Sequence, residues 1–273
     1  MTFIEDVISI VLPQFNHWLI WIAFLLALGI VVFLYIYQYH KNPKKEFSYS
    51  HIGIPLANII SLYIFTKMLE GIIYQESIIK IDQWFNANIG AIYSPGLTKI
   101  AVILTGFGSI TVISIMCVAA LGVLLFLKRW RYALLSAFSV LGALALEIII
   151  KTIVHRPRPL NSLVDVYHDM FPGSFPSGHA IMAIVFASLL IYSFKDDVKN
   201  FLIRNVLIVI SFSFFVLVGI SRIYLNAHWF SDVLGGLSLG LAWFMTVVLI
   251  ERSITGLRTA IKVETKKAKP LIA

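Results

Sequence analysis

Residues 201–250 read FLIRNVLIVISFSFFVLVGISRIYLNAHWFSDVLGGLSLGLAWFMTVVLI, two long apolar runs on either side of a short polar turn. The runs, 201–222 and 229–250, are each long enough to cross a bilayer as a helix, which takes about 20 mainly apolar residues. Five more runs lie at 17–37, 52–73, 99–127, 132–154 and 178–194, and the last of these is short. The pattern predicts an all-α integral membrane protein with seven transmembrane helices.

The composition of the chain points to the bilayer as its main solvent. Of its 273 residues, 59% are hydrophobic and 13% are charged, and the mean hydropathy is +0.88. Soluble domains have about 25% charged residues, so this chain has too few to cover a surface in water. The net charge of +8 comes from Lys and Arg in the gaps between apolar runs, which suits a membrane protein rather than a nucleic-acid-binding one.

The basic gaps also predict an orientation. Four basic segments, each two crossings from the next, are His40–Lys45, Lys128–Arg131, Lys195–Lys199 and the tail beyond Arg252. Basic loops stay in the cytoplasm, so we expect the N-terminus outside and the C-terminus inside. Residues 1–10 contain no Lys or Arg, and we therefore expect no cleaved signal peptide.

The loops 74–98, 155–177 and 223–228 then face outside. Loop 74–98 has the composition of an interfacial amphipathic helix with Trp84 at headgroup level. Loop 155–177 is basic on the side where basic residues are unexpected, which invites a functional explanation.

A first group of candidate residues lies where run 132–154 ends. Lys151 and Arg158 can both be directed at one site, because Pro157 turns the chain out of the helix. They could equally be two cations that reach the membrane surface. Glu147, one helical turn before Lys151, is expected to form an i,i+4 ion pair with it. Arg156 and His155 are expected to be accessory residues or to face lipid headgroups.

A second group precedes run 178–194. Ser177 suits a helix N-cap, and Gly178 would allow a ligand to approach the backbone closely. The free amides of such a helix start bind anions, and His179 lies within the same turn. An ordinary helix start would have the same Ser-Gly sequence.

A third group lies in the turn of the opening stretch. Arg222 ends one run, His228 begins the next, and Asp232 lies one helical turn further on. A carboxylate at this spacing can accept the Nδ1–H of the imidazole and leave Nε2 free to attack. A purely structural His–Asp pair remains open.

All three groups fall on one side of the predicted topology, and together they describe a phosphoryl site. The patterns Lys-x6-Arg-Pro, Pro-Ser-Gly-His and Ser-Arg-x5-His-x3-Asp, in this order, resemble the type 2 phosphatidic acid phosphatase (PAP2) family, in its bacterial membrane lipid phosphatase branch. The resemblance covers roughly residues 75–250. It implies a six-helix transmembrane core, so that run 17–37 is an additional N-terminal helix. We accordingly divide the chain into N-terminal membrane helices at 1–74, a phosphatase core at 75–250 and a basic cytoplasmic tail at 251–273.

The resemblance also implies a mechanism. His228 is the expected nucleophile and forms a phosphohistidine, while His179 is the general acid and base and Asp232 orients His228. The phosphate-binding residues are expected to be Lys151, Arg158, Ser177, Gly178 and Arg222. Neither a metal nor a cofactor is required, because the cations replace Mg²⁺; the alternative is that the histidines and Asp232 bind a metal.

A site at the outer membrane surface favours a lipid phosphate or diphosphate as substrate. Within the resembling family, the candidates are undecaprenyl diphosphate, phosphatidylglycerophosphate, phosphatidic acid and lipid A phosphates. The alternatives are a lipid phosphotransferase with the same site, a vanadate-dependent haloperoxidase and a transporter of anions or lipid phosphates. Seven apolar runs argue against the haloperoxidases, which are soluble, and a transporter would carry its charges near the bilayer midplane.

Overall fold

The structure is a computed structural model that describes residues 17–41, 49–164, 173–194 and 197–268. These residues contain no β-strand, nine α-helices and one short 3-10 helix. The helices are α2 (His17–Lys41), α3 (Tyr49–Ile73), α4 (Ser77–Asn88), η2 (Ile89–Ile92), α5 (Pro95–Phe107), α6 (Ile110–Phe126), α7 (Trp130–Val154), α8 (Gly178–Phe194), α9 (Phe201–Tyr224) and α10 (Phe230–Ala268).

The prediction of an all-α membrane protein is confirmed, and each of the seven apolar runs is helical. Among the described helices, α2, α3, α7, α9 and α10 are each long and apolar enough to cross a membrane. The short run is α8, with 17 residues. It has a long buried side, which indicates that it lies inside the bundle rather than at its periphery.

The prediction of one continuous helix at 99–127 is wrong. This run forms α5 and α6, which are bent by 47° at the break between them. The bend follows from Gly108 and Ser109. The Ser109 hydroxyl accepts a hydrogen bond from the Val112 amide at 3.4 Å, and Ser109 is thus the N-cap of a new helix. Gly108 lies so close to α9 that a Cβ atom there would be 2.6 Å from Val218.

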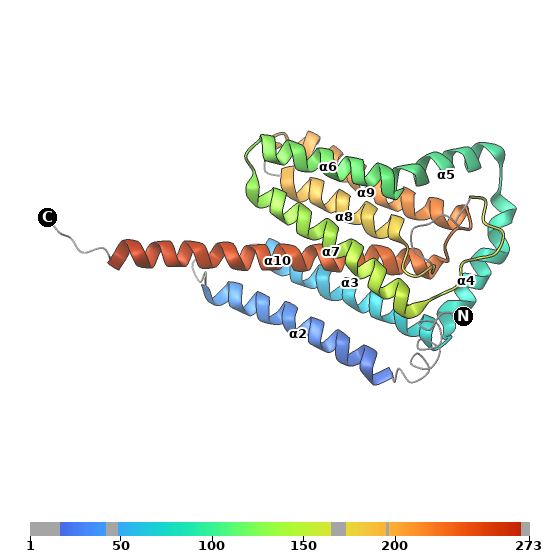
Figure 1. The fold of residues 1–273 in the computed structure, drawn as a ribbon, viewed down its shortest axis with the longest axis horizontal. Helices are drawn as coiled ribbons and strands as arrows, with labels where there is room; N and C mark the ends of the chain where they lie inside the picture. The colour runs from blue at the N-terminus through green and yellow to red at the C-terminus, as the bar shows by residue number, and fades with distance from the viewer. Residues whose placement is uncertain (1–16, 42–48, 165–172, 195–196, 269–273) are drawn as a thin grey trace.

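Helix α10 is the centre of the bundle. It packs against α2, α3, α7, α8 and α9, and it projects beyond them at its C-terminal end (Figure 1). It has 39 residues and continues well past position 250, so the expected boundary between core and tail lies inside this helix. Close contact with α8 depends on Gly240, where a Cβ atom would lie 2.6 Å from Ile184.

Helix α2 lies at the edge of the bundle, beside α3 (Figure 1). The Trp21 indole near its start donates a hydrogen bond of 2.9 Å to Glu70 near the end of α3, so the two helices are antiparallel. Much of α2 is exposed apolar surface, and so is the outer side of α9. Such broad apolar surfaces suit contact with lipid rather than water.

The two ends of the bundle differ in character. At one end, the turn between α6 and α7 meets the segment before α9, because Arg129 pairs with Asp197. Arg131 pairs there with Glu251 of α10. The other end holds the C-terminal ends of α3, α7 and α9 and the N-terminal ends of α5, α8 and α10 (Figure 1). The candidate residues and Lys128–Arg131 thus lie at opposite ends of the bundle, whereas the side of the membrane that each end faces stays a prediction.

Some of the predicted features lie outside the described residues. They are the N-terminal residues 1–10 and parts of the basic segments, namely 42–45, Lys195 and Lys269.

Candidate functional site

The first group of candidate residues lies where α7 ends. Lys151 is in the last turn of the helix, and His155 closes it in the left-handed conformation with φ +49°. The chain then leaves the helix before Pro157, as predicted. Lys151 Nζ lies 2.8 Å from Glu147 Oε1, and both side chains are buried. The predicted i,i+4 ion pair is therefore confirmed.

Gly178 has a different neighbour from the one expected. A Cβ atom at this position would lie 2.1 Å from the Glu147 carboxylate. The absence of a side chain thus admits Glu147 to the start of α8, next to Lys151. The expected role of Gly178, close approach of a ligand to the backbone, stays a prediction.

Ser177 precedes α8, as expected of an N-cap residue, but its hydroxyl makes no capping bond. The hydroxyl is buried and has no hydrogen-bond partner among the described residues. Leaving a buried polar group unpaired costs about 1–3 kcal/mol, so a group of this kind suits contact with a ligand. The Ser177 amide donates to the Asp232 carbonyl at 3.0 Å, which fixes the start of α8 against α10.

His228 lies between Asp232 and Arg158. Its Nδ1 is 3.4 Å from Asp232 Oδ2, and its Nε2 is 3.3 Å from Arg158 Nη1. A guanidinium has no acceptor, so Nε2 must accept and the proton belongs on Nδ1. This is the tautomer that the i,i+4 spacing predicts.

His228 lies in the turn between α9 and α10, outside the membrane-spanning segments. Its burial is the main cause that holds its pKa well below the ordinary value, and the nearby Arg222, Arg158 and Lys151 act in the same direction. The backbone of Ser174 acts weakly in the opposite direction. The imidazole is therefore neutral at neutral pH.

The Asp232 carboxylate is fully buried in the first turn of α10. It accepts hydrogen bonds from the Trp229 amide at 2.9 Å, from Arg156 Nη1 at 2.6 Å and from the Ser174 hydroxyl. These donors hold its orientation toward His228. Arg156 is only 8% exposed, so the expectation that it faces lipid headgroups is wrong.

Three residues of this network were missed in the sequence: Asp82, Ser174 and Ser231. Asp82 of α4 accepts from Arg156 Nη2 at 2.6 Å and from the Ser231 amide at 2.8 Å. The sequence marks Asp82 as unusual, because it shares a helical side with the apolar residues Ile78 and Phe85, but it does not reveal its partners. Trp84, on the opposite side of α4, is exposed.

The candidate residues surround a pocket of about 280 Å³ at this end of the bundle. Its polar lining comes from the ends of α5, α7, α8 and α9, from the break between α5 and α6 and from the turn before α10: Thr105, Ser109, Glu147, Lys151, His179, Arg222 and His228. Arg222 Nη1 donates to Thr105 Oγ1 at 2.9 Å, which aligns the guanidinium along the wall. Gly178 is also part of the lining, while Arg158 reaches the site through its contact with His228.

The pocket can hold an anion next to two imidazoles. Three basic side chains from separate segments, Lys151, Arg158 and Arg222, converge on it, and this convergence is typical of phosphate sites. Among the described residues, no group of three His, Cys, Asp or Glu side chains is placed to hold a metal ion.

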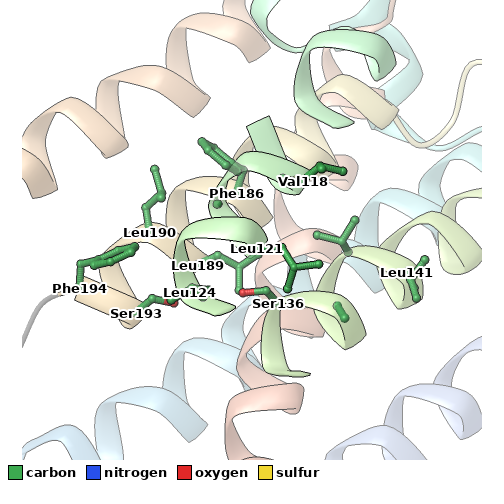
Figure 2. Close-up of a pocket in the computed structure, with 14 residues that line it drawn as sticks. Val118, Leu121, Leu124, Ser136, Leu141, Phe186, Leu189, Leu190, Ser193 and Phe194 are labelled. Carbon is green, nitrogen blue, oxygen red and sulfur yellow. The ribbon is translucent and has the colours of Figure 1, made fainter. Parts of the chain in front are cut away.

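A second pocket, of about 220 Å³, lies between α6, α7 and α8, toward the opposite end of the bundle (Figure 2). Its lining is apolar apart from Cys117 and the hydroxyls of Ser136 and Ser193. None of the described residues that line this space is charged or a histidine, in contrast to the first pocket.

Comparison with known proteins shows similarities in both sequence and fold. Residues 132–254 match the PAP2 superfamily. The chain is 28% identical over 202 residues to phosphatidylglycerophosphatase B of Bacillus subtilis (strain 168), which covers 73% of this chain and 97% of that protein. A crystal structure of a transmembrane PAP2-type phosphatidylglycerolphosphate phosphatase from Bacillus subtilis has the same fold. Its TM-score is 0.60 at 24% identity, and the match covers 78% of this chain and 98% of the other.

The lowered pKa of His228 predicts how its imidazole titrates. As the pH falls, the imidazole should stay neutral through pH 6.5, the ordinary pKa of histidine, and become protonated only below it. NMR of the protein with ¹³C-labelled histidine would show this, and the His228 signal is assigned by its loss in His228→Gln. A midpoint at or above pH 6.5 would contradict the electrostatic description of the site.

Proposed function

We propose that the chain is a PAP2-type phosphatase that hydrolyses the phosphate of a membrane lipid through a phosphohistidine at His228. Support comes from the match of residues 132–254 to the PAP2 superfamily and from the similarity to a phosphatidylglycerophosphatase. The observation that carries this proposal is the contact chain from Asp232 through His228 to Arg158, beside a pocket that also contains His179. It provides a nucleophile, an orienting carboxylate, a cation for the phosphoryl group and a second imidazole.

In the proposed first step, Nε2 of His228 attacks phosphorus and the bond to the leaving oxygen breaks. His179, in its protonated form, gives its proton to that oxygen, and the lipid alcohol leaves. In the second step, neutral His179 takes a proton from a water molecule. This water attacks the phosphohistidine, releases inorganic phosphate and returns His228 to its neutral form.

The electrostatic demand is met by the cations around the pocket. The transferred group spreads negative charge over its oxygens, and we assign Lys151, Arg158 and Arg222 to these oxygens. The unpaired Ser177 hydroxyl and the amides at the start of α8, next to Gly178, supply directed donors. Asp232 stabilises the imidazolium character that His228 acquires as it bonds to phosphorus.

A lipid substrate fits the position of the pocket in the bundle. The pocket opens where the ends of several transmembrane helices meet, and its lining includes the apolar residues Ile110, Leu144 and Met182. A phosphate headgroup could thus bind while its tail stays in the apolar region. The name of the Bacillus relative favours phosphatidylglycerophosphate, ahead of phosphatidic acid and undecaprenyl diphosphate.

We further propose that the site faces outside and that α10 ends in the cytoplasm. Support comes from the end of the bundle opposite the pocket, which contains Lys128, Arg129 and Arg131. Positively charged loops are retained in the cytoplasm, and the pocket is at the other end.

The substrate proposal predicts phosphate release by purified protein in detergent, without any membrane gradient. We expect release from phosphatidylglycerophosphate at least about ten-fold faster, in kcat/KM, than from a soluble phosphate monoester, because the tail adds binding energy. The assay would compare the three lipids in excess chelator, with colorimetric detection of phosphate.

Each alternative has its own outcome in this panel. Release confined to the soluble ester would contradict the lipid assignment, and activity restored only by a divalent ion would contradict a metal-free mechanism. Transfer of phosphate to a second lipid would identify a phosphotransferase. An absence of turnover with every substrate would contradict the hydrolase proposal as a whole.

The nucleophile assignment predicts a covalent intermediate on His228. His228→Gln should lower kcat by at least about 10³-fold, as loss of a nucleophile does, without lowering the apparent Tm by more than a few degrees. Rapid acid-free quenching of wild-type protein with radiolabelled substrate should give a base-stable, acid-labile phosphoprotein. The variant should give none. His51→Gln is the matched control, because His51 lies in the first turn of α3, at the end of the bundle opposite the site. Label retained in His228→Gln would remove it as the nucleophile.

The orientation proposal predicts which engineered thiols an impermeant reagent reaches in intact cells. The chain has one cysteine, Cys117, inside α6, so background labelling should be low. Lys80→Cys, on exposed α4, should be labelled from outside, and Lys128→Cys only after lysis. The opposite pattern would invert the topology.

A further inference from the structure

Asp82 and Arg156 form a buried ion pair beside the proposed catalytic residues, yet neither lines the pocket. Asp82 is 1% exposed and Arg156 is 8% exposed. Charges buried to this degree are costly unless they are paired and hydrogen-bonded. The contacts of Asp82 and Arg156 therefore indicate which groups they hold in place.

The guanidinium of Arg156 joins two carboxylates. Nη2 donates to Asp82 Oδ2 at 2.6 Å, and Nη1 donates to Asp232 Oδ1 at 2.6 Å. Nη1 also donates to the Ser231 hydroxyl at 2.7 Å. The planar fork of arginine suits this role, whereas a lysine would present one nitrogen in place of two.

Asp82 holds the other side of the same assembly. Its Oδ1 accepts from the Ser231 amide at 2.8 Å, and its Oδ2 accepts from the Ser231 hydroxyl at 2.6 Å. Ser231 directly precedes Asp232, so Asp82 fixes both the backbone of this turn and the arginine that contacts the carboxylate. The indole of Trp229 lies 5.4 Å from the guanidinium and covers it.

The charges of the assembly explain why Arg156 is not a phosphate ligand. Its single positive charge faces two negative ones, so little attraction is left for a substrate anion. Asp232 Oδ1 is taken by Arg156, while Oδ2 is the oxygen next to His228 Nδ1. With one oxygen held by a cation, the carboxylate cannot rotate away from the imidazole.

We propose that Arg156 and Asp82 are positioning residues that act through Asp232 and set the tautomer and orientation of His228. The inference rests on the proposed function, in which His228 is the nucleophile. It assigns a role to α4, since the carboxylate that orients the nucleophile is held by a side chain from that helix.

The test replaces Asp82 by asparagine, which keeps the shape and leaves Arg156 and Asp232 as a neutral pair. We expect kcat to fall about 10- to 100-fold, as for other residues that support a functional group from behind, with KM changed less than about two-fold. Asp197→Asn is the matched control, because it removes an ion-pair partner of Arg129 at the other end of the bundle. It should leave kcat and KM unchanged.

A spectroscopic measurement separates positioning from mere folding stability. With ¹⁵N-labelled histidine, His228 of the wild-type protein should show the Nδ1–H tautomer alone at neutral pH. Asp82→Asn should show a second tautomer, because Asp82 acts on His228 through Arg156 and Asp232. If Asp82→Asn does not fold, Arg156→Lys provides the same test, since it keeps the charge but not the fork.

The outcomes distinguish this inference from the function on which it rests. Full turnover in Asp232→Asn would overturn the proposed catalytic pair itself. A large loss in Asp232→Asn, with wild-type kcat and a single tautomer in Asp82→Asn, would overturn only the positioning role. A fall in kcat with the tautomer unchanged would also overturn it, because Asp82 would then act by another route.

Discussion

The buried carboxylate of Asp232 is the interaction on which the rest of the site depends. It receives Arg156 from the loop after α7, Ser174 from the segment before α8, and the Trp229 amide from the turn before α10. A carboxylate without these donors would be strongly disfavoured in such a position. The segments must therefore meet for the end of the bundle to form, and when they meet, His228 is already oriented.

The basic residues at this end divide into two sets. Arg156 is neutralised by two carboxylates and belongs to the framework. The contacts of Arg158 and Arg222 include hydrogen bonds to neutral groups, the Ala227 carbonyl and the Thr105 hydroxyl. A bound phosphate could replace such bonds with stronger charge-assisted ones. Lys151 is intermediate, because Glu147 already pairs with it. The basic residues at this end of the bundle thus have different roles because their hydrogen-bond and ion-pair partners differ.

The helices were largely predictable, because a run of about 20 apolar residues has few alternatives in a bilayer. Two details were not. The break at Gly108 and Ser109 lies inside an apolar run. A hydropathy profile cannot reveal that the Ser109 hydroxyl caps a new helix or that Val218 packs closely against Gly108. The far end of α10 was also missed, since a polar helix that leaves the bundle has no apolar pattern to reveal its length.

The sequence by itself determined the fold class, the ends of the helices that carry chemistry and the residues of the three motifs, because these depend on local pattern and spacing. Only the tertiary structure decided how Arg156 is used and that Asp82 takes part. Asp82 lies 74 residues from Arg156 and 149 from Ser231 along the chain. No local pattern encodes a contact over such distances. The contacts of Asp82 form because α4 packs against the start of α10, where the buried Asp82 carboxylate is stabilised by Arg156 and Ser231.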